Sequence, residues 1–121
     1  MVKVPVTVLV LSKAKPGMEE RVRQEILSVV KRALQEPTCI HIYLHQDMND
    51  STNFMLYENW TDKEDFVNVQ VKSPHVQDYM KRCKEFLVDL PEITLWEMQF
   101  KGEGEAVNST EDISKEFAKA L

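Results

Sequence analysis

Apolar residues alternate with other residues at the start of the chain and then change to a helical spacing. Over Val4–Ser12 the valines fall on every second position, and β-branched residues at that period predict a strand. A Pro-Gly turn follows, after which apolar residues recur every three or four positions with charged residues between them. This second pattern predicts an amphipathic helix from Met18 to Leu34, which Pro37 stops.

The two-residue alternation returns in three later segments. It predicts strands over Cys39–Asp47, Asn53–Trp60 and Ile93–Phe100. A short polar turn separates the first two of these, so we expect them to form an antiparallel hairpin. One face of the second strand of this hairpin carries Phe54, Leu56, Glu58 and Trp60.

Two helix-start signals lie between the third and fourth predicted strands. Thr61 and Glu64 have the spacing of a capping box, in which a hydroxyl caps the helix and a carboxylate closes it three residues later. Ser73 and Pro74 start a second helix, because Ser is a common cap and Pro suits the first helical position. We expect this second helix to carry one apolar stripe and to end at Pro91.

The predicted elements follow the order β-α-β-β-α-β, which is the ferredoxin-like arrangement of the α+β class. This order gives an antiparallel four-stranded sheet with helices on one face. We expect the domain to occupy residues 1–101. A tail over 102–121 follows, with a short, weak helix from about Thr110.

A sheet covered by helices on one side leaves its second face bare. Several of the strands are apolar on both sides, so the bare face also needs a cover. We expect that face to hold Val6, Val8, Val10, Met55 and Tyr57, or the complementary set. A homodimer that packs sheet against sheet is the economical solution.

The composition is that of a small globular protein and argues against several functions. The 121 residues are 43% hydrophobic and 29% charged, enough for one domain with a real core. The net charge of −5 argues against a nucleic-acid partner. The apolar start is far shorter than a membrane span, so we expect no membrane contact. The two cysteines form no disulfide framework or metal motif, so we expect a cytoplasmic protein without a bound metal.

Three residues are candidates for chemistry. Glu58 places a carboxylate on an apolar strand face, where it needs a hydrogen-bond donor or a task, and pairing with a basic helix residue is the simpler alternative. Trp60 can donate its indole N–H to a substrate oxygen, or it can seal the core. His75, near a helix N-terminus, can take a proton from an acidic phenol or enol, or it can lie on the surface.

A second polar group alternates along the second predicted strand. His41, Tyr43 and His45 point to one side, but no carboxylate or cysteine at a useful spacing completes a metal site. We interpret this row, led by Cys39, as a polar strand face at the rim of a dimer. Tyr57, on the neighbouring strand, is expected to serve the dimer as well.

Two motifs occur together at a particular separation. The third predicted strand contains the pattern F-x-x-Y-E-x-W from Phe54 to Trp60, and a capped helix leads from it to a Ser-Pro-His start at 73–75. With the Lys-Pro-Gly turn at 15–17 and the Glu-Pro-Thr-Cys segment at 36–39, this pattern resembles the antibiotic biosynthesis monooxygenase (ABM) family. The resemblance covers roughly residues 4 to 100. It implies a dimeric α+β barrel, in which each protomer has a pocket between its sheet and its helices.

The resemblance also implies a small-molecule substrate and, as in part of the family, oxygenation of a phenol or quinol without a cofactor. His75 would then act as the base, while Trp60 and Gln70 would stabilise the developing oxyanion. The substrate contacts implied for the strand face and the short helix are Phe54, Leu56, Glu58 and Gln70.

One position departs from the family pattern. Many relatives carry a second histidine about five residues before the Ser-Pro-His start, where this chain has Gln70. Haem-degrading relatives use that histidine as an iron ligand, with an asparagine on the first strand that this chain lacks, so haem degradation is disfavoured. Two alternatives stay open. One is a ligand-binding or stress-response dimer without chemistry. The other is a sugar-phosphate isomerase, which would need a cationic phosphate clamp in the pocket, whereas Lys81 and Arg82 on the last long helix have a spacing suited to solvent.

Overall fold

The structure is a computed structural model that describes residues 2–106. The strands are β1 (Val6–Lys13), β2 (Cys39–Gln46), β3 (Asn53–Trp60) and β4 (Glu92–Trp96). The helices are α1 (Glu19–Ala33), α2 (Lys63–Asp65) and α3 (Pro74–Arg82), with a π turn at Phe66–Gln70 and a 3-10 turn at Cys83–Glu85. The helix predicted from about Thr110 lies outside the described residues.

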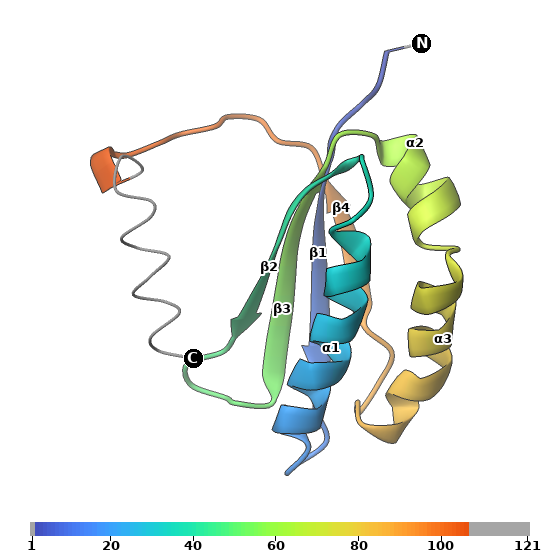
Figure 1. Cartoon of the computed structure of the whole chain (residues 1–121). Coiled ribbons are helices and arrows are strands. Elements are labelled where there is room, and N and C mark those ends of the chain that lie inside the picture. The colour runs from blue at the N-terminus through green and yellow to red at the C-terminus, as the bar shows by residue number, and fades with distance from the viewer. Residues whose placement is uncertain (1, 107–121) are drawn as a thin grey trace.

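The four strands form one antiparallel sheet in the order β2-β3-β1-β4. The two central strands, β3 and β1, come from distant parts of the chain, and the hairpin partner β2 lies at one edge. Figure 1 shows α1 and α3 on the same side of the sheet. The predicted ferredoxin-like α+β fold is therefore confirmed.

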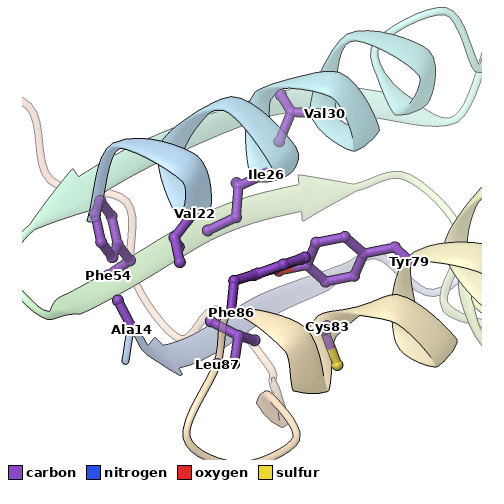
Figure 2. Packing of buried hydrophobic residues seen from close by; sticks show 9 residues of the cluster. All are labelled: Ala14, Val22, Ile26, Val30, Phe54, Tyr79, Cys83, Phe86 and Leu87. Atoms are coloured by element: carbon purple, nitrogen blue, oxygen red, sulfur yellow. The ribbon is translucent and has the colours of Figure 1, made fainter. Parts of the chain in front are cut away.

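Two groups of buried side chains hold the helices on the sheet. The larger group, shown in Figure 2, contains Ala14, Val22, Ile26, Val30, Phe54, Tyr79, Cys83, Phe86 and Leu87. The smaller group lies towards the opposite end of β1 and β3 and contains Val6, Val8, Ala33, Trp60 and Phe66. Each large apolar side chain buried in this way contributes about 1.5–3 kcal/mol to the stability of the fold. Both groups therefore hold the helices on the sheet.

The strand register decides which face of the sheet stays open. Val8 lies opposite Glu58, so the β1 valines face the helices together with the apolar side of β3. The prediction that grouped these valines with Met55 and Tyr57 is wrong, because paired residues on antiparallel strands share a face. The other face, which we call the open face, includes Thr7, Leu9, Leu11, His41, Tyr43, His45, Met55, Tyr57, Asn59, Thr94 and Trp96, with Lys13 and Glu92 at one end.

A β-bulge redirects the first residue of β2. The pairing with β3 shifts between Cys39 and His41, which leaves Ile40 as an extra residue that is 55% exposed. Cys39 therefore packs with the smaller core group. The prediction that it leads the row of His41, Tyr43 and His45 is wrong. The inserted residue places Cys39 on the opposite face from His41. The alternating sequence pattern alone does not indicate this bulge.

The two helix starts after β3 differ from the sequence prediction in detail. Thr61 is not the cap, because its N–H donates to the carbonyl just before β2 at 2.9 Å and so continues the sheet pairing. Asp62 is the cap instead, and its Oδ1 accepts the N–H of Asp65 at 3.3 Å. Ser73 does occupy the cap position of α3, but its hydroxyl donates to the carbonyl of Gln70 at 2.7 Å.

The last strand is shorter than predicted. It ends at Trp96, opposite Thr7, although the alternation continues to Phe100. β1 offers few further partners, because it begins at Val6 and the residue before it is a proline without an N–H. Figure 1 shows the chain leaving the sheet after β4, and we call residues 97–102 the arm.

Candidate functional site

Glu58 and Trp60 form a closed pair on the helix-covered side of β3. The Trp60 Nε1–H donates a hydrogen bond of 2.8 Å to Glu58 Oε1. Only 7% of Glu58 and 1% of Trp60 is exposed. Phe66 packs against the indole, with the ring centroids 5.4 Å apart. The donor that Glu58 requires is thus its own strand neighbour and not a basic helix residue, which was the simpler expectation.

The surroundings of Glu58 disfavour its charge. Burial raises the pKa of its carboxyl, and the hydrogen bond from Trp60 offsets only part of that effect. The nearby Cys39 responds in the same direction, because burial and the Glu58 carboxylate raise the pKa of its thiol to about 11. Cys39 is therefore a thiol at neutral pH, and a nucleophilic thiolate has no support at this position.

Gln70 is buried at the end of the π turn, and its amide is already bound. Its Nε2 donates to Asp65 Oδ2 at 3.1 Å, and the same oxygen accepts the Thr38 hydroxyl at 2.7 Å. The π turn itself is closed by the Val71 N–H, which donates to the carbonyl of Phe66 at 3.0 Å. Sequence reasoning missed Asp65 and Thr38, since no local spacing relates a residue before β2 to one after β3.

His75 is half-buried at the start of α3. Its Nε2 lies 3.5 Å from the hydroxyl of Ser73, which in turn donates to the backbone carbonyl of Gln70. These contacts join His75 to the end of the π turn, while Trp60 contacts Phe66 at its beginning. The π turn therefore lies between the two groups that were predicted to meet in one pocket.

Phe54 and Leu56 belong to the other end of β3. Phe54 is 3% exposed and packs in the larger core group, and Leu56 packs partly buried against that group. Arg23 lies over the Phe54 ring, 5.8 Å from its centroid. The predicted set of site residues is thus divided between the two core groups.

Two of the hollows on the described part of the chain lie away from the Glu58–Trp60 pair. One, of about 610 Å³, lies where β1, β3 and β4 meet the hairpin turn. Phe54 is the predicted site residue in its lining, together with polar residues such as Lys13 and Asp47. The other, of about 510 Å³, lies between the open face and the arm, beside Thr7 and Tyr57.

Arg82 and Lys81 on α3, the basic residues considered for an isomerase, do not form a phosphate-binding site. Arg82 donates to Glu25 at 2.6 Å and to Asp78 at 2.8 Å, so its guanidinium is occupied. Lys81 is exposed. Within residues 2–106, no group of three or more histidine, cysteine or acidic side chains could hold a metal ion. No helix in that range has the length and apolar character of a membrane span.

These features define a small α+β protein with a ferredoxin-like sheet and a buried polar pair beneath its helices. The sequence profile of the family described as antibiotic biosynthesis monooxygenase matches residues 5–82. The match extends over more than half of the chain, so this protein belongs to that family. A comparison with curated proteins finds no match.

Solved structures share the fold at low sequence identity. A Pseudomonas aeruginosa protein has a TM-score of 0.73 and 23% identity, covering 83% of this chain and 99% of its own. A candidate antibiotic biosynthesis monooxygenase from Nitrosomonas europaea has a TM-score of 0.73 and 14% identity, with coverages of 85% and 98%. One from Deinococcus radiodurans has a TM-score of 0.73 and 18% identity, with coverages of 82% and 97%. At these identities the likeness concerns the fold alone.

Proposed function

We propose that this protein is a small-molecule enzyme of the ABM type, which oxygenates an electron-rich phenol or quinol without a cofactor. The substrate would bind between sheet and helices, next to Glu58 and Trp60. One observation carries this proposal: a carboxyl and an indole N–H, both buried, are bonded to each other beside an apolar core group. Membership of the family supports the class of activity.

The polar groups divide the work of the proposed reaction. His75 is the general base that takes the substrate proton, directly or through a water molecule. The Trp60 N–H and the Gln70 amide are the donors to the developing oxyanion. Glu58 and Asp65 occupy these donors in the structure, so substrate binding has to exchange partners. Protonation of Glu58, which burial favours, lowers the cost of releasing the indole.

The remaining proposed contacts are apolar. Leu56 and Phe54 lie further along the same face of β3 and would form a hydrophobic wall for a flat ring. Sites for small aromatic molecules combine such walls with a few placed polar groups. The distance along β3 from these two residues to Trp60 would limit the length of a fused-ring substrate bound between sheet and helices.

The proposed reaction needs no external reductant. The deprotonated substrate passes electrons to O2, and a bond forms between a substrate carbon and one oxygen atom. The O–O bond then breaks, the carbon becomes a carbonyl carbon, and the second oxygen atom leaves as water. All four electrons that reduce O2 come from the substrate, so a phenol becomes a quinone and a quinol becomes a hydroxyquinone.

We also propose that two copies associate through their open faces. Members of this family are generally dimeric. Leu11, Tyr43 and Trp96 on this face are 45%, 54% and 55% exposed, and its charged strand residues, Lys13 and Glu92, lie at one end. A face with exposed apolar and aromatic side chains is typical of an interaction surface.

A non-catalytic ligand-binding dimer is the second candidate. The observation in its favour is that Glu58 and Trp60 satisfy each other and are sealed from solvent. A buried polar pair of this kind can serve packing alone. The two candidates therefore differ in whether the pair opens for a substrate.

Oxygen consumption with a panel of naphthols and naphthoquinols tests the first candidate. We expect one O2 to be consumed for each substrate molecule. We expect His75→Ala to lower kcat by at least about 100-fold, since a positioned base contributes that much or more. Trp60→Phe keeps an aromatic ring but loses the N–H, and we expect a loss of about 10-fold or more. His45→Ala, an exposed histidine on the open face, is the matched control and should change nothing.

Two results would decide against this mechanism. Unchanged turnover in both His75→Ala and Trp60→Phe excludes the roles given to these residues. Binding of a quinol without oxygen consumption supports the ligand-binding dimer instead.

A further inference from the structure

Three polar side chains on the open face form a hydrogen-bonded chain across three strands. The Thr7 hydroxyl donates to Asn59 Oδ1 at 2.5 Å, and Asn59 Nδ2 lies 2.8 Å from His41 Nε2. Thr7 and Asn59 are only 8% and 6% exposed, although they lie on the side of the sheet opposite the helices. The chain is therefore an ordered part of the sheet and not a loose surface contact.

The direction of these bonds sets the protonation of His41. The amide Nδ2 of Asn59 can only donate, so Nε2 of His41 accepts and carries no proton. Protonation of Nε2 would set two donors against each other. The amide of Asn59 would then have to turn over, and the Thr7 hydroxyl would have to accept where it now donates. A charged His41, which must donate from Nε2, thus requires the opposite polarity along the whole chain.

Aromatic rings and one ammonium group surround His41. On β2 its ring stacks on Tyr43, with centroids 4.4 Å apart and planes 4° from parallel, and on β3 Tyr57 lies 5.9 Å away. From the arm, the positive charge of Lys101 acts on the ring, and Lys101 is itself paired with Glu103 at 3.4 Å. Burial, followed by the charge of Lys101, lowers the pKa of His41.

We propose that His41 makes the association of two copies of this chain depend on pH. This inference rests on the homodimer proposed above and adds the condition under which it forms. A second copy on the open face would remove the remaining water around His41 and fill the hollow beside Thr7 and Tyr57. A neutral imidazole tolerates that loss of water, whereas an imidazolium close to Lys101 does not. The dimer is therefore stable at neutral pH and weakens in acid.

The sign and size of the effect follow from proton linkage. The dimer binds fewer protons than two separate monomers, so its dissociation constant rises as the pH falls. Each protomer contributes one His41. The dissociation constant therefore rises by up to about 100-fold for each pH unit below the pKa of His41 in the monomer.

Analytical ultracentrifugation of the full chain at about pH 8 and about pH 5.5, at equal ionic strength, tests the proposal. We expect the dissociation constant to be higher at the lower pH. His41→Gln keeps a polar side chain but cannot become charged, and we expect less than about a 3-fold change. His75→Gln, on α3 at the other side of the sheet, is the matched control and should keep the pH dependence of the unmodified chain.

The outcomes separate the two proposals. A monomer at pH 8 overturns the homodimer and this inference with it. A dimer with the same dissociation constant at both pH values overturns this inference and leaves the homodimer standing. The same holds if His41→Gln keeps the full pH dependence. Should that variant fail to fold, an NMR titration of the His41 ring decides, since its pKa must fall as protein concentration promotes association.

Discussion

The two faces of the sheet each hold an ionisable side chain that is hydrogen-bonded to a residue of β3. On the helix-covered face the Glu58 carboxyl accepts from Trp60, and on the open face the His41 ring contacts Asn59. Burial opposes the charge in both places, raising the pKa of Glu58 and lowering that of His41. The difference is the cover: helices of the same chain close one face, and a second copy is proposed to close the other.

This difference gives the two groups opposite effects on stability. The folded pKa of Glu58 is raised, so its contribution is present below its unfolded value near 4.5 and is lost as the pH rises through the folded value. The folded pKa of His41 is lowered, so its contribution is present above its unfolded value near 6.5 and is lost as the pH falls through the lower folded value. The group on the helix-covered face thus stabilises the fold most at acidic pH, and the group on the open face does so at neutral pH.

The two tryptophans give the largest expected contrast between the faces. Trp60→Ala removes a fully buried ring and leaves Glu58 without its donor, and we expect a loss of about 3–5 kcal/mol in the free energy of unfolding. Trp96→Ala, on the open face, should cost less than about 0.5 kcal/mol while the chain is monomeric. Urea denaturation at low protein concentration measures both. Similar losses in the two variants would remove the distinction between the faces.

A smaller effect sharpens the electrostatic part of the comparison. Glu58→Gln keeps an acceptor for Trp60 and removes the titrating proton. Relative to this variant, we expect the unmodified chain to lose stability between about pH 4.5 and neutrality, by about 1.4 kcal/mol for each unit by which the pKa of Glu58 is raised. Urea denaturation at several pH values gives the difference. If the difference in unfolding free energy between the two proteins does not change with pH, burial does not shift the pKa of Glu58.

The smallest effect concerns the hydrogen-bonded chain of the open face. Thr7→Val keeps the shape of the side chain but removes the donor to Asn59. We expect a loss of about 0.5–1.5 kcal/mol, the usual net value of one such bond. Thr94→Val, an acceptor for the exposed Trp96, is the control and should cost less. Thermal unfolding of both variants makes the comparison, and an equal cost would argue against an ordered chain at Thr7.

Much of the fold could be predicted because its signals are local. Alternating valines, the change to helical spacing and the Pro and Gly breaks lie within short windows, and they led to the observed order of elements. Two errors came from pairing between distant segments. The bulge at Ile40 and the end of β4 at Trp96 depend on what the partner strand offers, which no single window contains.

The candidate site was predicted less completely for the same reason. The oddity of a carboxylate on an apolar strand face pointed to Glu58, and its neighbour Trp60 is indeed its partner. The bond from Gln70 to Asp65, shared with Thr38, joins three segments and left no trace in local spacing. Which sheet face remained open also depended on register, since β1 is apolar on both sides.

The indole resonances of the two tryptophans test most directly where a substrate binds. Each face has one indole N–H, on Trp60 beneath the helices and on Trp96 at the open face. In a titration with a naphthoquinol followed by ¹H–¹⁵N NMR, we predict that the Trp60 signal moves to saturation while the Trp96 signal stays in place. A shift of Trp96 alone, with Trp60 unchanged, would contradict a site between the sheet and the helices.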